Sequence, residues 1–182
     1  MNRSIAFLRA VNVGGRTVTM DELRRLFEAL GFAQVETFIA SGNVIFRADD
    51  AGEAVLAARI EAHLKQALGY QVAVFLRTPG ELAEIVGRQP FAPASVAAAR
   101  ALWVGVLRAP PDDAAAARLR ALGSSHNQFH LHGRELYWLR HTSEREATVS
   151  GAQIERALAT PTTMRNITTL RTLAAKYPAT LP

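Results

Sequence analysis

The stretch FLRAVNVGGRTVTM, residues 7–20, joins an apolar run to a glycine-rich loop and then to the start of a helix. The apolar run begins upstream, and Arg3 to Leu8 is predicted to be a β-strand. Thr19 followed by Glu22 has the spacing of a capping box, which predicts a helix that begins there and ends at Gly31. The chain therefore opens with a strand, a turn and a helix.

The segment that follows supplies the rest of a sheet. Its predicted elements are two β-rich runs at 35–40 and 44–47, a helix from about Gly52 to Leu68 and a strand at 72–76. Ser41, Gly42 and Asn43 join the two β-rich runs, which is typical of a hairpin. The order β-α-β-β-α-β predicts the split βαβ, ferredoxin-like arrangement.

The second half repeats most of this order. Its predicted elements are a strand at 101–107, a helix from Asp112 and Asp113 to Leu122, two strands around residues 132–134, and helices at about 151–158 and 163–177. Segment 87–100 has two prolines and no clear periodicity, so it is interpreted as a linker. We predict an α+β fold with a ferredoxin-like half at 1–78, a helix and linker at 79–100, and a smaller α+β half at 101–182.

The strands of the first half are apolar at successive positions rather than at alternating ones. Such strands are covered on both faces of their sheet. The two helices of the first half cover one face. We therefore expect the second half, or another chain, to cover the other.

The predicted strand order brings two distant segments together. The first strand ends beside the hairpin turn, so NVGG and SGN meet at one edge of the sheet. Glycine lets backbone N–H groups approach a ligand, and arginine adds a planar fork of donors. The candidate ligand-binding residues there are Arg9, Asn12, Gly14, Gly15, Ser41, Gly42 and Asn43. The alternative is structural: the glycines make turns, the asparagines bond to neighbouring backbone, and Arg9 pairs with a carboxylate such as Asp21.

The closing segment TTMRN offers a second candidate. A helix that begins near Thr162 or Thr163 places Arg165 and Asn166 in its first turn, where a cation opposes the helix dipole. Either a carboxylate such as Glu155 or a bound anion should offset that charge. Arg165 and Asn166 are therefore added to the candidate ligand-binding residues.

The histidines do not indicate a metal site. His130 and His132 alternate along a predicted strand and share a face, as some metal ligands do. Phe129 and Leu131 occupy the other face, which fits simple amphipathic alternation with the histidines toward solvent. Because no carboxylate is placed as a third ligand, we predict neither a metal nor a cofactor.

The chain is basic, with a formal net charge of +5 and a pI near 10.4. Residues 1–90 carry ten basic and ten acidic side chains, whereas residues 91–182 carry eleven and six, so the excess lies in the second half. This distribution supports nucleic-acid binding as an alternative function. Phosphate-loop, dinucleotide and nucleophile-elbow motifs are missing, so the sequence assigns no catalytic residue.

Cysteine is absent, which rules out disulfides and favours the cytoplasm. The apolar run at 5–11 is too short for a membrane span or a signal peptide. No interaction with a membrane is predicted.

Two stretches resemble a known bacterial family. Residues 7–46, which contain FLRAVNVGG, a helix ending in LGF and the SGN hairpin, are similar to the opening of the family called domain of unknown function 1697. Residues 162–173, TTMRNITTLRTL, resemble its closing segment. Ala10 stands where the family tends to have glycine, and Ile167 where it tends to have tryptophan. The resemblance implies an α+β fold with a ferredoxin-like first half and no assigned activity.

Three functions follow from these observations. The first is binding of a small anionic or phosphate-bearing ligand at the NVGG and SGN edge, with Arg9 or Arg165 as the counter-charge. The second is nucleic-acid binding through the basic second half. The third is a protein-interaction module whose sheet is completed by a partner.

Overall fold

The computed structural model describes residues 1–12, 14–39, 42–49, 51–141 and 149–179. The chain divides into two compact units. The first contains Met1–Ala83 and the residues from Lys176 onward, and the second contains Glu84–Ala175. Segment 84–100 thus groups with the second unit.

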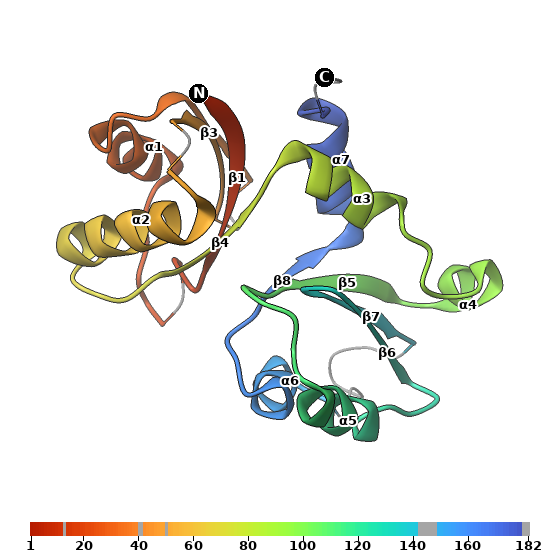
Figure 1. Cartoon of the computed structure of the whole chain (residues 1–182). Coiled ribbons are helices and arrows are strands. Elements are labelled where there is room, and N and C mark those ends of the chain that lie inside the picture. Colours follow the sequence, from red (N-terminus) through yellow and green to blue (C-terminus); the bar gives the residue numbers. More distant parts are fainter. Residues whose placement is uncertain (13, 40–41, 50, 142–148, 180–182) are drawn as a thin grey trace. The chain divides into compact units, whose positions relative to one another are not determined.

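The first unit is built on one antiparallel sheet (Figure 1). Its elements are β1 (Asn2–Arg9), α1 (Met20–Ala29), β2 (Ala33–Phe38), β3 (Asn43–Ala48), α2 (Glu53–Leu68) and β4 (Ala73–Arg77), and α3 (Pro79–Gly87) follows. The strand order is β2-β3-β1-β4, with β3 antiparallel to both β1 and β2. This is the predicted ferredoxin-like topology.

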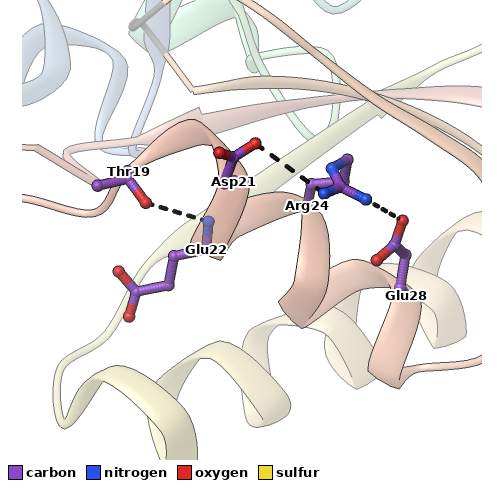
Figure 2. Close-up of polar contacts among 5 residues, drawn as sticks. All are labelled: Thr19, Asp21, Glu22, Arg24 and Glu28. Carbon is purple, nitrogen blue, oxygen red and sulfur yellow. Dashed lines mark hydrogen bonds and ion pairs between the residues drawn. The ribbon is translucent and has the colours of Figure 1, made fainter.

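Helix α1 begins where the sequence predicts. The Thr19 side chain accepts a hydrogen bond from the Glu22 N–H at 3.1 Å, which satisfies one free donor of the first turn (Figure 2). Arg24 donates to Glu28 at 2.7 Å and lies 4.0 Å from Asp21 on the exposed side of the helix. Such exposed pairs add only a few tenths of a kcal/mol, about 0.3–0.5 for an i,i+4 pair. Burial of Leu23 against the sheet is the larger contribution.

Aromatic side chains form the centre of the first core. Phe27 of α1 meets Phe46 of β3 edge to face, with ring centroids 5.3 Å apart, and Phe32 stacks on Phe46 at 4.6 Å. On the other face of the same sheet, Ile5 and Phe7 are completely buried. The strands of this sheet therefore carry buried apolar residues on both faces.

The second unit repeats the topology of the first. Its elements are α4 (Pro93–Ala98), β5 (Ala101–Val106), α5 (Asp113–Ala121), β6 (Asn127–His132), β7 (Glu135–Arg140), α6 (Gly151–Leu158), β8 (Thr163–Asn166) and α7 (Ile167–Lys176). The strand order β6-β7-β5-β8 corresponds to β2-β3-β1-β4. Helices α5 and α6 lie on one face of this sheet, where their apolar residues join one core cluster with β7 (Figure 1).

The last helix was predicted wrongly at its start, because residues 163–166 form strand β8. Thr163 lies opposite Val106 and Arg165 opposite Val104, so β8 completes the sheet beside β5. Gly105 leaves room for this pairing: a Cβ there would lie 2.8 Å from the Met164 sulfur. Strand pairing has overridden the helical spacing of the apolar residues. Helix α7 starts only at Ile167.

Lys176 and Tyr177 belong to the first unit, where they bond to its sheet. The Tyr177 hydroxyl donates to Glu36 of β2 at 2.7 Å, and the Lys176 ammonium group donates to the same oxygen at 3.0 Å. The Arg3 guanidinium lies 5.7 Å from the centre of the Tyr177 ring. The hydrogen bonds from Tyr177 and Lys176 lower the pKa of Glu36.

Tyr177→Phe is expected to lower the free energy of unfolding by about 1 kcal/mol at pH 7, because it removes one hydrogen bond to a half-exposed carboxylate. Since the folded pKa of Glu36 lies below its ordinary 4.5, this stability is present above pH 4.5 and is lost as the pH falls through the folded pKa. Urea unfolding of both proteins at pH 7 and pH 3 measures it. A difference that is equally large at pH 3 would contradict the assignment to Glu36.

Candidate functional site

The two predicted segments do meet at one edge of the first sheet. Strand β1 ends at Arg9, and the Leu8 N–H donates to the Gly42 carbonyl at 2.8 Å. Gly42 has φ +73°, and a Cβ on it would lie 2.9 Å from a methyl carbon of Val11. The hairpin turn therefore packs directly against the end of β1. Ser41, the remaining candidate of this turn, lies outside the described residues.

The two asparagines of this edge bond to the backbone. Asn12 accepts from the Val18 N–H at 2.7 Å and donates to the Val18 carbonyl at 3.2 Å, which closes the loop between them at its base. Asn43 is completely buried and donates to the Phe38 carbonyl at 2.9 Å. The structural alternative is therefore correct for these contacts: both side chains fix the backbone of the edge.

Gly14 and Gly15, in the loop between Asn12 and Val18, are not packed against other side chains as Gly42 is. Gly14 and Gly15 are exposed, with φ +68° and +79°, and nothing lies within 4 Å of the position of a Cβ at either glycine. The next residue, Arg16, lies over the Tyr70 ring at 4.2 Å, and the Tyr70 hydroxyl donates to the Val11 carbonyl at 2.8 Å. An open backbone thus lies next to a positioned guanidinium group.

Arg9 is half-buried at the end of β1. Alternation along the strand places it on the same face as Phe7, away from the core cluster that contains Leu8. The next residue, Ala10, adopts φ +59°. Glycine would take this conformation without the strain of about 1–2 kcal/mol that a Cβ introduces.

The other two candidates, Arg165 and Asn166, belong to the second unit and to a strand. The argument from a helix dipole is therefore wrong for Arg165. Its side chain is 6% exposed and donates to the Thr163 hydroxyl at 2.8 Å and to the Met164 carbonyl at 3.0 Å. Burial lowers its pKa to about 10. Glu155, proposed as its partner, accepts from the Thr162 N–H at 2.9 Å.

Asn166 has a capping role. Its side-chain oxygen accepts a hydrogen bond from the Thr168 N–H at 2.9 Å, and α7 begins at the residue between them. This contact satisfies a donor of the first helical turn. Like Asn12 and Asn43, Asn166 stabilises the local backbone.

Sequence analysis missed a polar cluster on the second sheet. His130 lies opposite Tyr137 with ring centroids 6.2 Å apart, and the Tyr137 hydroxyl donates to the Ile85 carbonyl at 3.1 Å. Burial lowers the pKa of His130, and the electrostatic interactions with His132 and Arg88 lower it further. Burial also raises the pKa of Tyr137 to about 12. The alternating pattern of β6 predicted the face of the strand on which His130 lies. It did not predict that another segment of the chain covers that face.

The packing of the other residues of β6 matches the prediction. Phe129 and Leu131 pack against the core cluster formed with α5 and α6, and His132 is exposed. His130 differs because it is half-buried, with the Phe91 ring 6.5 Å away. Within the part of the chain that the structure describes, no group of three or more His, Asp or Glu side chains is arranged to hold a metal ion.

Part of the basic excess of the second half is not on its surface. Arg140 and Arg165 are buried, and Arg118 donates to the Ala157 carbonyl at 2.8 Å. Arg134 donates to the Arg108 carbonyl at 3.5 Å, the outer limit of a hydrogen bond. These contacts weaken the argument from charge for nucleic-acid binding, which stays a prediction.

The described helices include none that is long and apolar enough to cross a membrane.

Two ferredoxin-like units in one chain define the class: an α+β protein with a repeated βαββαβ topology. The chain belongs to the family described as "Protein of unknown function (DUF1697)", whose model matches residues 1–137. The matched range includes the NVGG and SGN segments, and the closing segment 162–173 lies beyond it.

A solved structure supports the fold over the whole chain. The conserved bacterial protein SP0830 from Streptococcus pneumoniae superimposes with a TM-score of 0.77 at 21% identity, covering 98% of this chain and 99% of that one. At this identity the likeness shows the fold alone. A comparison with curated proteins found no match.

Proposed function

We propose that the protein binds a small anionic or phosphate-bearing ligand at the edge formed by the NVGG and SGN segments. The observation that carries this proposal is the loop between Asn12 and Val18. Two hydrogen bonds fix its base, while Gly14 and Gly15 are exposed and unhindered. A backbone that is held at Asn12 and Val18 and open at Gly14 and Gly15 offers N–H donors to an anion with little loss of conformational entropy on binding.

Two arginines lie at or next to this loop in the sequence. Arg9 ends β1 just before it, and Arg16 is held over the Tyr70 ring inside it. A guanidinium fork fits the oxygens of a phosphate or carboxylate group. We assign the counter-charge to Arg9 and Arg16 in place of Arg165, whose guanidinium is buried in β8 of the second unit. The absence of cysteine favours the cytoplasm as the setting.

Thermal unfolding with and without inorganic phosphate tests the proposal. Phosphate at 100 times its Kd stabilises a protein by about 2.7 kcal/mol, which raises the melting temperature by several degrees. Arg9→Gln and Arg16→Gln are each expected to abolish most of this rise. Arg25→Gln, a change at an exposed position on α1, is the matched control and should keep it. No rise in the parent protein, or the same rise in all four proteins, would refute the proposal.

A further inference from the structure

The second unit contains a groove that the sequence did not indicate. It lies on the face of the sheet turned away from α5 and α6, because Leu102 of β5 lines it while the neighbouring Trp103 packs toward those helices. Its volume is about 380 Å³, within the range of about 300–1,000 Å³ typical of small-molecule sites.

The groove combines an apolar wall with positive charge. Phe91, Val96 of α4 and Leu102 of β5 form the wall. Arg88 and Arg171 of α7 line the same groove, and both are exposed. An inorganic anion gains nothing from the wall, and a neutral apolar molecule gains nothing from the guanidinium groups. The lining therefore matches a molecule that has both features.

A neighbouring hollow indicates at which end of the groove the anionic group of a ligand binds. The hollow shares Arg88 with the groove and is also lined by His130 and Glu84. The Glu84 carboxylate repels an anion at that end. Arg171 lines only the groove, so the anionic group is best accommodated on the Arg171 side, with its apolar body against Val96 and Leu102.

We propose that this groove binds a small organic anion, a molecule with a carboxylate or phosphate group on an apolar body about the size of one ring. The site is separate from the glycine loop of the first unit and requires different residues.

Calorimetric titration of the full chain with phenyl phosphate, inorganic phosphate and phenol tests the ligand class. In the Arg16→Gln variant, whose glycine loop lacks its guanidinium group, phenyl phosphate is expected to bind the groove with 1:1 stoichiometry, at least tenfold more tightly than either of the other two probes. Arg171→Gln should weaken its binding about tenfold, since it removes one charge-assisted contact. Arg120→Gln, a change at an exposed position on α5, should leave the binding unchanged.

A second pair of variants tests the apolar wall without removing charge. Ala97→Trp places a large ring in the groove and is expected to abolish binding of phenyl phosphate. Ala98→Trp is the control: it changes the next exposed residue of α4, which does not line the groove, and should leave the binding unchanged. Unchanged binding in Ala97→Trp would overturn the proposal, as would equal weakening by Arg120→Gln and Arg171→Gln. Binding of phenyl phosphate that is lost in Arg16→Gln but kept in Arg171→Gln would place it at the glycine loop and refute the groove.

Discussion

Gly42→Ala is expected to lower the free energy of unfolding by about 2–5 kcal/mol, one of the two largest effects that the structure predicts. An alanine there must adopt φ +73°, which costs about 1–2 kcal/mol. Its Cβ would also lie 2.9 Å from the Val11 methyl carbon and 3.1 Å from the Leu8 Cβ, and such overpacking costs a further 1–3 kcal/mol or so. Chemical unfolding of both proteins measures the change.

Gly14→Ala is a matched control because it shares only the first of these costs. Its φ is +68°, but nothing lies within 4 Å of the position of the new Cβ. We expect a loss of about 1–2 kcal/mol. Equal losses in the two variants would show that the hairpin turn does not pack against the end of β1 as described.

The first unit could be predicted almost completely from the sequence because its local signals agree with its tertiary contacts. Thr19 begins a helix that an independent apolar pattern continues, and Gly42 makes the turn that the flanking β-rich runs require. Once the order β-α-β-β-α-β is known, connection rules leave few arrangements of the strands. The meeting of the NVGG and SGN segments follows from that arrangement.

Strand β8 was missed because a short edge strand is specified by its partner. The apolar residues Met164 and Ile167 have helical spacing, which extended the predicted helix over the four residues of β8. Asn166, which caps α7, was included in that predicted helix. What decides the structure is the edge of β5, where Gly105 leaves space for Met164. That information lies about sixty residues earlier in the chain.

The candidate site was predicted in position but not in detail. Residue types at the loop edge were consistent with both ligand binding and local hydrogen bonding, and the choice depends on distances that no pattern contains. Asn12 and Asn43 proved to bond to the backbone. The groove of the second unit was not foreseen because its lining comes from segments that have no shared motif.

Arg165→Ala is expected to lower the free energy of unfolding by about 2–4 kcal/mol, because it leaves a cavity and removes the donor to the Thr163 hydroxyl. Arg165→Met should recover most of that loss, because methionine fills similar space and leaves a smaller cavity. The buried charge, whose pKa burial lowers from 12.5 to about 10, is absent from both variants and therefore does not contribute to the difference between them.

The direction of the pKa shift of Arg165 determines the pH at which the stabilities of the three proteins must be compared. Because the folded pKa of Arg165 is the lower one, the folded state is penalised wherever the guanidinium is charged, which includes pH 7, and the penalty fades only as the pH rises above about 10. Unfolding of the three proteins in urea at pH 7 should separate Met from Ala by about 2–4 kcal/mol, the loss that the cavity causes. A methionine variant as unstable as the alanine variant would mean that the contacts of the guanidinium outweigh its burial. Changes below about 0.5 kcal/mol in both variants would instead indicate that the Arg165 side chain is not buried in the sheet.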